Sequence, residues 1–176
     1  MVAGEIMIVW DTVYEIWASW QSGDITIDML DLLFVVTAVV FNLQVVGVYI
    51  ASKNGRLDIS KKFGAMILIL AIPLAIVFSG YWINGREMWI MLGLGVIFLY
   101  LFLELLLDFI LKIQFRKKPL MHIPYIILFY VVQVALITIA FSIDRSWGWF
   151  VSVTFWALLV ALIYSLWPKK KPSTVM

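Results

Sequence analysis

The sequence has no cysteine, a single histidine and few charged residues. Of its 176 residues, 14% are charged and 64% are hydrophobic. Without cysteine the chain cannot form a disulfide, a thiolate nucleophile or a thiolate metal site. One histidine excludes bis-histidine haem ligation and most zinc geometries, so we expect no cofactor and no metal centre. A soluble domain of this length cannot bury so much apolar surface, which predicts an integral membrane protein surrounded by lipid.

Motifs for catalysis and nucleotide binding are missing as well. The chain contains no nucleotide-binding glycine loop, no HExxH and no GxSxG. The net charge is only +2, and nothing in the sequence predicts a nucleic-acid partner. These absences favour a protein that acts by binding over an enzyme, although they leave the enzyme question open.

Five apolar segments are each close to the roughly 20 residues that cross about 30 Å of hydrocarbon. Pro73 lies at the centre of the second segment, where it should remove the hydrogen bond to the Ile69 carbonyl and bend the helix. Pro124 and the Asp144-Arg145 turn mark the two ends of the fourth. The predicted fold is an all-α bundle of five transmembrane helices in a single membrane domain, with helices at 27–50, 63–83, 88–113, 125–142 and 147–167.

Residues 5–21 are too polar to span a membrane. Trp10, Trp17 and Trp20 recur there at helical spacing and form an apolar stripe opposite acidic side chains. This pattern predicts an amphipathic helix lying in the membrane interface. Because its polar face is acidic, we expect it on the side away from the anionic cytoplasmic lipid.

Lysine and arginine alternate between dense and sparse segments along the chain. The segments 51–62, 112–118 and 168–176 hold four, four and three of these residues, whereas the alternate segments hold none, one and one. Cytoplasmic loops carry the excess of positive charge in membrane proteins. The pattern therefore predicts a multi-pass protein of the cell membrane with its N-terminus outside and a basic cytoplasmic tail at 168–176.

Tryptophan placement gives the same threading independently, because the indole ring prefers the membrane interface. Trp156 falls near mid-depth, and Trp167 falls at the inner boundary. Seven other tryptophans fall at the predicted outer boundary and are expected to anchor the bundle there: Trp10, Trp17, Trp20, Trp82, Trp89, Trp147 and Trp149.

The third predicted helix carries two acids in its second half. Tyr100 lies near its midplane, which places Glu104 about 6 Å and Asp108 about 12 Å toward the cytoplasm. With Lys112 these residues recur every four positions, so they should share one helix face. An acid at the depth of Glu104 costs about 2.5 kcal/mol or more if it faces lipid, so it should face the bundle interior. Glu104 and Asp108 are candidate cation, proton or ligand sites; alternatively, Lys112 or a loop arginine neutralises Asp108 in a structural ladder.

A second polar set falls near mid-depth on four different helices. It consists of Asn42, Tyr100, Gln133 and Thr154. These side chains could line a pocket for a ligand or ion, together with the carbonyl freed by Pro73. The alternative, which we favour, is that they join helices by hydrogen bonds of about 0.6 to 1.7 kcal/mol each.

Asp24, Asp28 and Asp31 form an acidic face at the start of the first predicted helix. Three carboxylates at this spacing could hold a hard cation such as calcium. No loop with ligand spacing accompanies them, and acids are expected in the first turns of a helix because of its dipole. We favour the second interpretation and predict no metal site.

Three functions fit these observations. The first is a non-catalytic membrane subunit or accessory protein that binds lipid and either a membrane partner or a second copy of itself. The second is a transport or ligand-binding protein for a small solute or ion, using the carboxylates of Glu104 and Asp108. The third is a lipid-modifying enzyme in which the same two acids act as an acid/base or metal-binding pair.

Overall fold

The computed structural model describes Tyr14 and residues 26–111 and 119–167. Within these ranges it does not describe the side chains of Leu57, Lys61, Asp108, Phe109 and residues 119–122. The predicted interfacial helix at 5–21, with Trp10, Trp17 and Trp20, lies outside the described residues except for Tyr14. Lys112 and the basic tail lie outside them too.

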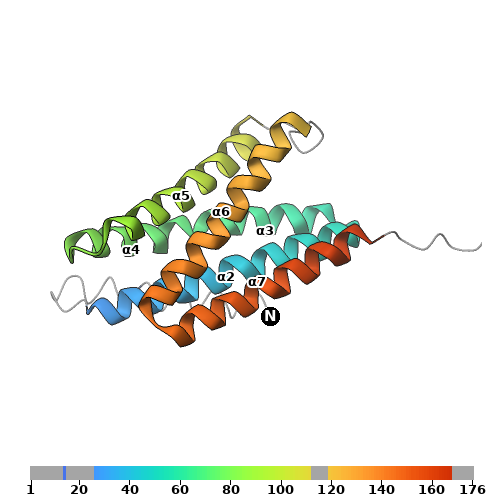
Figure 1. Ribbon diagram of the computed structural model, residues 1–176. Coiled ribbons are helices and arrows are strands. Elements are labelled where there is room, and N and C mark those ends of the chain that lie inside the picture. The colour runs from blue at the N-terminus through green and yellow to red at the C-terminus, as the bar shows by residue number, and fades with distance from the viewer. Residues whose placement is uncertain (1–13, 15–25, 112–118, 168–176) are drawn as a thin grey trace, which may run out of the picture.

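The described chain is all-helical (Figure 1). Its elements are α2 (Ile27–Lys53), α3 (Leu57–Ile69), α4 (Ala71–Ile83), α5 (Met88–Glu104), the π-helix η1 (Leu105–Ile110), α6 (Pro119–Ile143) and α7 (Arg145–Leu166). α3 and α4 together make one span, and α5 with the start of η1 makes another. Five helices are therefore long and apolar enough to cross a membrane. This confirms the prediction of five long apolar helices. Their insertion into a membrane and their orientation stay predictions.

Two Asn-Gly turns end α2 and α4 in the same way. Gly55 and Gly85 have φ angles of +74° and +64°. The amide after each glycine donates to the carbonyl five residues earlier at 3.0 Å, which is the Schellman arrangement for closing a helix. Because the cap closes the helix at this turn, α2 ends at Lys53, three residues beyond the predicted end at 50. α3 likewise begins six residues before the predicted start at 63, because helix formation does not stop where the apolar run stops.

The prolines of the two spans behave differently. The predicted interruption at Pro73 is confirmed, since α3 ends at Ile69, α4 begins at Ala71 and a turn at Leu70 lies between them. The expectation that Pro124 starts the fourth helix is wrong, because α6 begins at Pro119 and includes Pro124. A proline this close to the helix start removes one hydrogen bond without ending the helix, and Pro119 has the φ angle that a first helical residue needs.

Asp144 separates α6 from α7 and caps α7. Its side chain accepts the backbone N–H of Ser146 at 2.7 Å, so α7 begins at Arg145 rather than at the predicted 147. The backbone hydrogen bond from Ser146 lowers the pKa of the exposed Asp144 carboxyl, because it stabilises the charged form.

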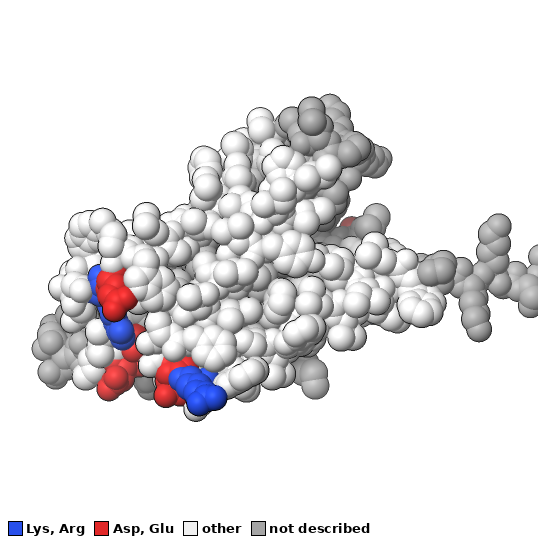
Figure 2. Space-filling view, viewed as in Figure 1, with Lys and Arg blue, Asp and Glu red and all other residues white. Residues whose placement is uncertain are grey.

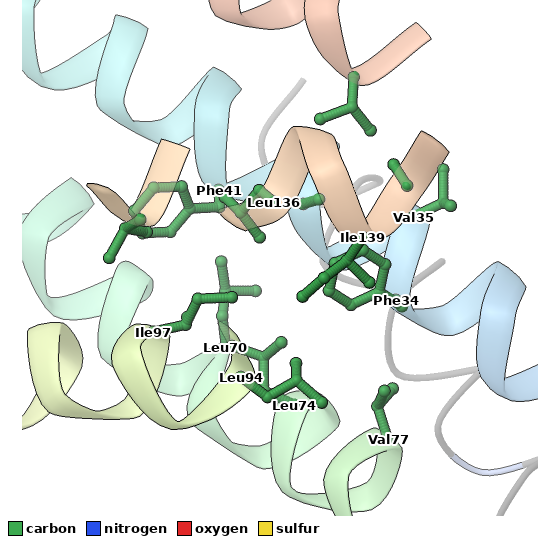
Figure 3. Packing of buried hydrophobic residues seen from close by; sticks show 14 of the residues in the cluster. Phe34, Val35, Phe41, Leu70, Leu74, Val77, Leu94, Ile97, Leu136 and Ile139 are labelled. Atoms are coloured by element: carbon green, nitrogen blue, oxygen red, sulfur yellow. The ribbon is translucent and has the colours of Figure 1, made fainter. Parts of the chain in front are cut away.

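α2 is the central helix of the bundle. It packs against α7, α3 and α4, while α6 packs against α7 and α5. Leu33, Phe34 and Ala38 of α2 are fully buried. They belong to a continuous apolar core that also takes side chains from α4, α5 and α6, including Leu74, Val77, Leu94, Ile97, Leu136 and Ile139 (Figure 3).

The described chain begins and ends at opposite ends of the bundle (Figure 1). α2 begins at the same end as the α4–α5 and α6–α7 turns. On the face drawn in Figure 2, most of the charged side chains among the described residues gather at that end. Four of the predicted anchors belong to the helix ends there, and all are exposed: Trp82, Trp89, Trp147 and Trp149. Their location in a membrane interface stays a prediction.

The close approach of α2 and α4 gives a test of the packing. A Cβ added to Gly80 would lie 2.4 Å from Leu30 Cδ1, and Leu30 is fully buried, so it has little room to move. We expect Gly80→Ala to lower the free energy of unfolding by about 1–2 kcal/mol, because overpacking exceeds the higher helix propensity of alanine. Thermal or denaturant unfolding in detergent measures the change.

Gly95→Ala on α5 is the matched control. No atom lies within 4 Å of the corresponding Cβ position, so this variant should be unchanged or slightly more stable. Equal losses of stability in the two variants would contradict the close α2–α4 contact.

Candidate functional site

Glu104, the last residue of α5, lies inside the bundle. Its side chain is 4% exposed, which confirms the expectation that it faces the interior rather than lipid. The Tyr125 hydroxyl of α6 donates a hydrogen bond to Glu104 Oε2. The Tyr100 and Tyr125 hydroxyl oxygens are 2.8 Å apart. The carboxyl group thus joins α5 to α6.

The two phenols are arranged as a relay toward this carboxyl group. Tyr125 has one hydroxyl proton, which it donates to Glu104, so Tyr100 is the donor in the contact between the two hydroxyls. The Tyr100 ring lies 5.5 Å from the Tyr125 ring, 6.0 Å from Phe41 and 5.8 Å from Phe129, measured between centroids. Aromatic rings from α2 and α6 therefore surround the phenol pair on the side toward mid-depth.

The expected face of Tyr100, Glu104, Asp108 and Lys112 is described only as far as Glu104, because the Asp108 side chain and Lys112 lie outside the described residues. Residues Leu105–Ile110 form a π-helix, and the Leu111 amide donates to the Leu106 carbonyl at 2.8 Å. Bonding to the fifth preceding residue widens the turn, so each residue advances by a smaller angle than in an α-helix. A four-residue step in this wider turn stays close to one helix face. Whether Asp108 pairs with Lys112 or binds a cation stays a prediction.

The mid-depth set is brought together only in part. Asn42 Nδ2 donates to Thr154 Oγ1 at 2.9 Å, which joins α2 to α7. Tyr100 instead belongs to the Glu104 group. Gln133 is fully buried on α6, and neither polar atom of its amide has a hydrogen-bond partner within the described structure.

A polar group that sequence reasoning missed lies at the opposite end of the bundle. Asp31 of α2 is 8% exposed. It accepts a hydrogen bond from the Tyr81 hydroxyl at 2.5 Å and an ion-paired one from Arg86 Nη2 at 2.6 Å. The Arg86 guanidinium also lies over the Tyr81 ring, 5.3 Å from its centroid. Asp31 thus connects α2 to the end of α4 and to the α4–α5 turn.

Of the acidic face predicted at Asp24, Asp28 and Asp31, Asp24 lies outside the described residues and Asp31 is paired with Arg86. Within the part of the chain that the structure describes, no three acidic or histidine side chains are grouped to hold a metal ion. The sequence does contain a signal for the observed contact, because Arg86 is the only cation in its turn and Asp31 lies at the same predicted membrane boundary. The two residues are 55 positions apart, however, and no local pattern relates them.

Comparisons with protein-family models, with curated proteins and with solved structures find no significant match to this chain.

The Asp31–Arg86 pair predicts an asymmetric response to mutation. Arg86→Leu leaves the Asp31 carboxylate buried without its cation, and we expect a loss of about 1–3 kcal/mol in the free energy of unfolding. This is less than for a fully buried pair, because the Arg86 side chain is 24% exposed. Unfolding in detergent at neutral pH measures the loss.

Adding Asp31→Leu to Arg86→Leu should recover much of the lost stability, since the stranded charge is then gone. Arg145→Leu, which changes an exposed arginine, is the control. The ion pair has no structural role if Arg86→Leu and Arg145→Leu have the same effect.

Proposed function

We propose that this protein is a non-catalytic component of a membrane complex, which binds a transmembrane helix of another subunit through the outer face of α7. Its polar side chains support this proposal, because three of the seven buried polar or charged side chains among the described residues join its own helices. Asp31 connects α2 to α4, Asn42 connects α2 to α7, and Glu104 connects α5 to α6. Such a bundle is suited to present a fixed surface to a neighbour.

The observation that carries the proposal is the position of Trp156. Its side chain is 63% exposed, and it lies ten or eleven residues from each end of α7, or about 16 Å along the helix axis. Its indole N–H has no hydrogen-bond acceptor within the described structure. Indole normally lies at the interface, where water and lipid headgroups accept this bond, whereas lipid tails offer no acceptor.

The residues around Trp156 form a continuous apolar stripe along α7. These residues are all more than half exposed and follow one another at alternating steps of three and four, which is the spacing used when transmembrane helices pack side by side: Trp149, Val153, Trp156, Val160, Ile163 and Trp167. A neighbouring helix on this stripe could supply the missing acceptor from a carbonyl or hydroxyl group. A second copy of the chain is the other occupant that the experiment must distinguish.

Trp156→Phe tests the proposal, because it keeps an aromatic ring and removes only the N–H. We expect the association to weaken about 3- to 20-fold, corresponding to about 0.6–1.7 kcal/mol for one interhelical hydrogen bond. The affinity-tagged full chain is extracted from its native membranes in lipid nanodiscs, and the mass of each particle is measured together with its subunit composition.

Trp149→Phe is the matched control, since Trp149 lies on the same stripe at the end of α7 and its N–H can reach the interface. The wild-type chain and this control should be found in particles that also contain a second polypeptide in fixed proportion. Particles that contain a single copy of the 20.3 kDa chain would overturn the proposal. Particles with two copies and no other protein would replace it with self-association.

The Glu104 group supports a second candidate function, which is binding of a proton or small cation within the membrane. Three features favour it: the depth of the carboxyl group inside the bundle, the phenol relay that ends on it, and the π-helix that follows it directly. Ionisable side chains inside the membrane and π-helical turns both occur frequently at functional sites.

Glu104→Gln separates this candidate from a structural role, since it keeps the shape of the side chain and removes its ability to ionise. If the site binds a proton or cation, the wild-type unfolding temperature in nanodiscs should change with pH or with added sodium, potassium or calcium. This dependence should disappear in Glu104→Gln. It should persist in Asp28→Asn, which removes an exposed acid. A dependence that survives in Glu104→Gln would exclude the site.

A further inference from the structure

The Gln133 amide is the most unusual polar group among the described residues. The side chain is 0% exposed on α6, and both Oε1 and Nε2 lack a hydrogen-bond partner. Its buried neighbours on α6 are apolar, with Phe129 and Val132 before it and Leu136 after it. A buried amide in a membrane bundle needs partners even more than one in a soluble core, because lipid cannot supply them.

Asn42 contributes a third atom without a partner. Thr154 has one hydroxyl proton, which it donates to the Val151 carbonyl at 2.7 Å. The Thr154 oxygen can therefore only accept from Asn42, which fixes Asn42 Nδ2 toward it. Asn42 Oδ1 consequently points elsewhere. It is buried, the side chain is 0% exposed, and this oxygen has no partner.

Gln133 and Thr154, the partner of Asn42, lie at similar distances along their helices from the α6–α7 turn. α6 and α7 form a hairpin around Asp144, with Gln133 eleven residues before the turn and Thr154 ten residues after it. At about 1.5 Å per residue, the two positions differ by only about 1.5 Å along their helices. Asn42 is bonded to Thr154, and α2, α6 and α7 all pack against one another.

We propose that Gln133 and Asn42 form a buried binding site for a small neutral molecule with hydrogen-bond donors and an acceptor, namely water. The unpartnered atoms are two acceptors, Asn42 Oδ1 and Gln133 Oε1, and one donor, Gln133 Nε2. A single water molecule matches this set, because it can donate to both oxygens and accept from the nitrogen.

The side chains of Gln133, Asn42 and Thr154 carry no charge, so the site selects a neutral molecule rather than an ion. It is separate from the Glu104 group, since Gln133 lies eight residues, or about 12 Å, along α6 from Tyr125. The inference therefore does not depend on either function proposed above.

Water-edited solid-state NMR tests this site directly. The full chain is labelled with ¹⁵N at the glutamine side chains and placed in bilayers with deuterated acyl chains. Magnetisation transfer from water to the side-chain amide of Gln133 is then measured. We expect a clear transfer signal, assigned by its disappearance in Gln133→Leu. In Asn42→Leu, which removes one side of the site, the signal should fall severalfold.

Gln44 provides an internal control in the same spectra, because its side chain lies outside this pair and its transfer should be the same in all variants. If Asn42→Leu does not fold, Thr154→Val replaces it; this variant leaves both amides in place but releases Asn42, and the transfer should again fall. No transfer to Gln133 in the wild type would overturn the site in favour of a direct Gln133–Asn42 hydrogen bond. Transfer that is unchanged in the Asn42 or Thr154 variant would also overturn it, since Gln133 would then be hydrated without Asn42.

Discussion

The constraint on which this structure depends is that a polar group enclosed in an apolar helix bundle needs a hydrogen-bond partner. Every polar group between the two ends of the bundle must therefore find a partner inside the protein or in a molecule that the protein encloses. The surface drawn in Figure 2 follows this rule, since most of the charged side chains among the described residues gather at one end. The described interior follows it as well, because its charged and phenolic side chains meet in two groups, Asp31–Tyr81–Arg86 and Tyr100–Tyr125–Glu104.

The same constraint explains how much of the fold could be predicted. Long apolar runs predict helices that could span a membrane, so the number of such helices follows from the sequence, and the cost of exposing an acid to lipid predicts the inward direction of Glu104. The positions of the helix ends were predicted less accurately. They depend on caps in the polar segments, such as the Gly55 turn and the Asp144 side chain. Pro124 misled the prediction because a proline inside the first turns of a helix and one that starts it look the same in the sequence.

The candidate site was predictable in its residues but not in its pairings. A depth argument identifies Asn42, Tyr100, Glu104 and Gln133, yet it cannot show that Tyr100 joins Glu104 through Tyr125 while Asn42 joins Thr154. Those contacts depend on the rotation of each helix about its axis, and one sequence does not contain that information. The π-helix after Glu104 shows the same limit, because nothing in the sequence predicts that the helical turn widens there.

The two polar groups have different surroundings, and this difference bears on where the protein can change. At the end containing Asp31, α2 and α4 approach closely at Gly80, and an ion pair connects α2 to the α4–α5 turn. Toward the other end, α5 and α6 diverge from α2, α3 and α7 (Figure 1), and the regular α5 helix gives way to a π-helix directly after Glu104. Interfaces held by close packing resist rearrangement, whereas π-helical turns interrupt the regular helix and are frequent at functional sites. A change in the protonation or occupancy of Glu104 would therefore act on the less constrained end, while the Asp31 group keeps the opposite end fixed.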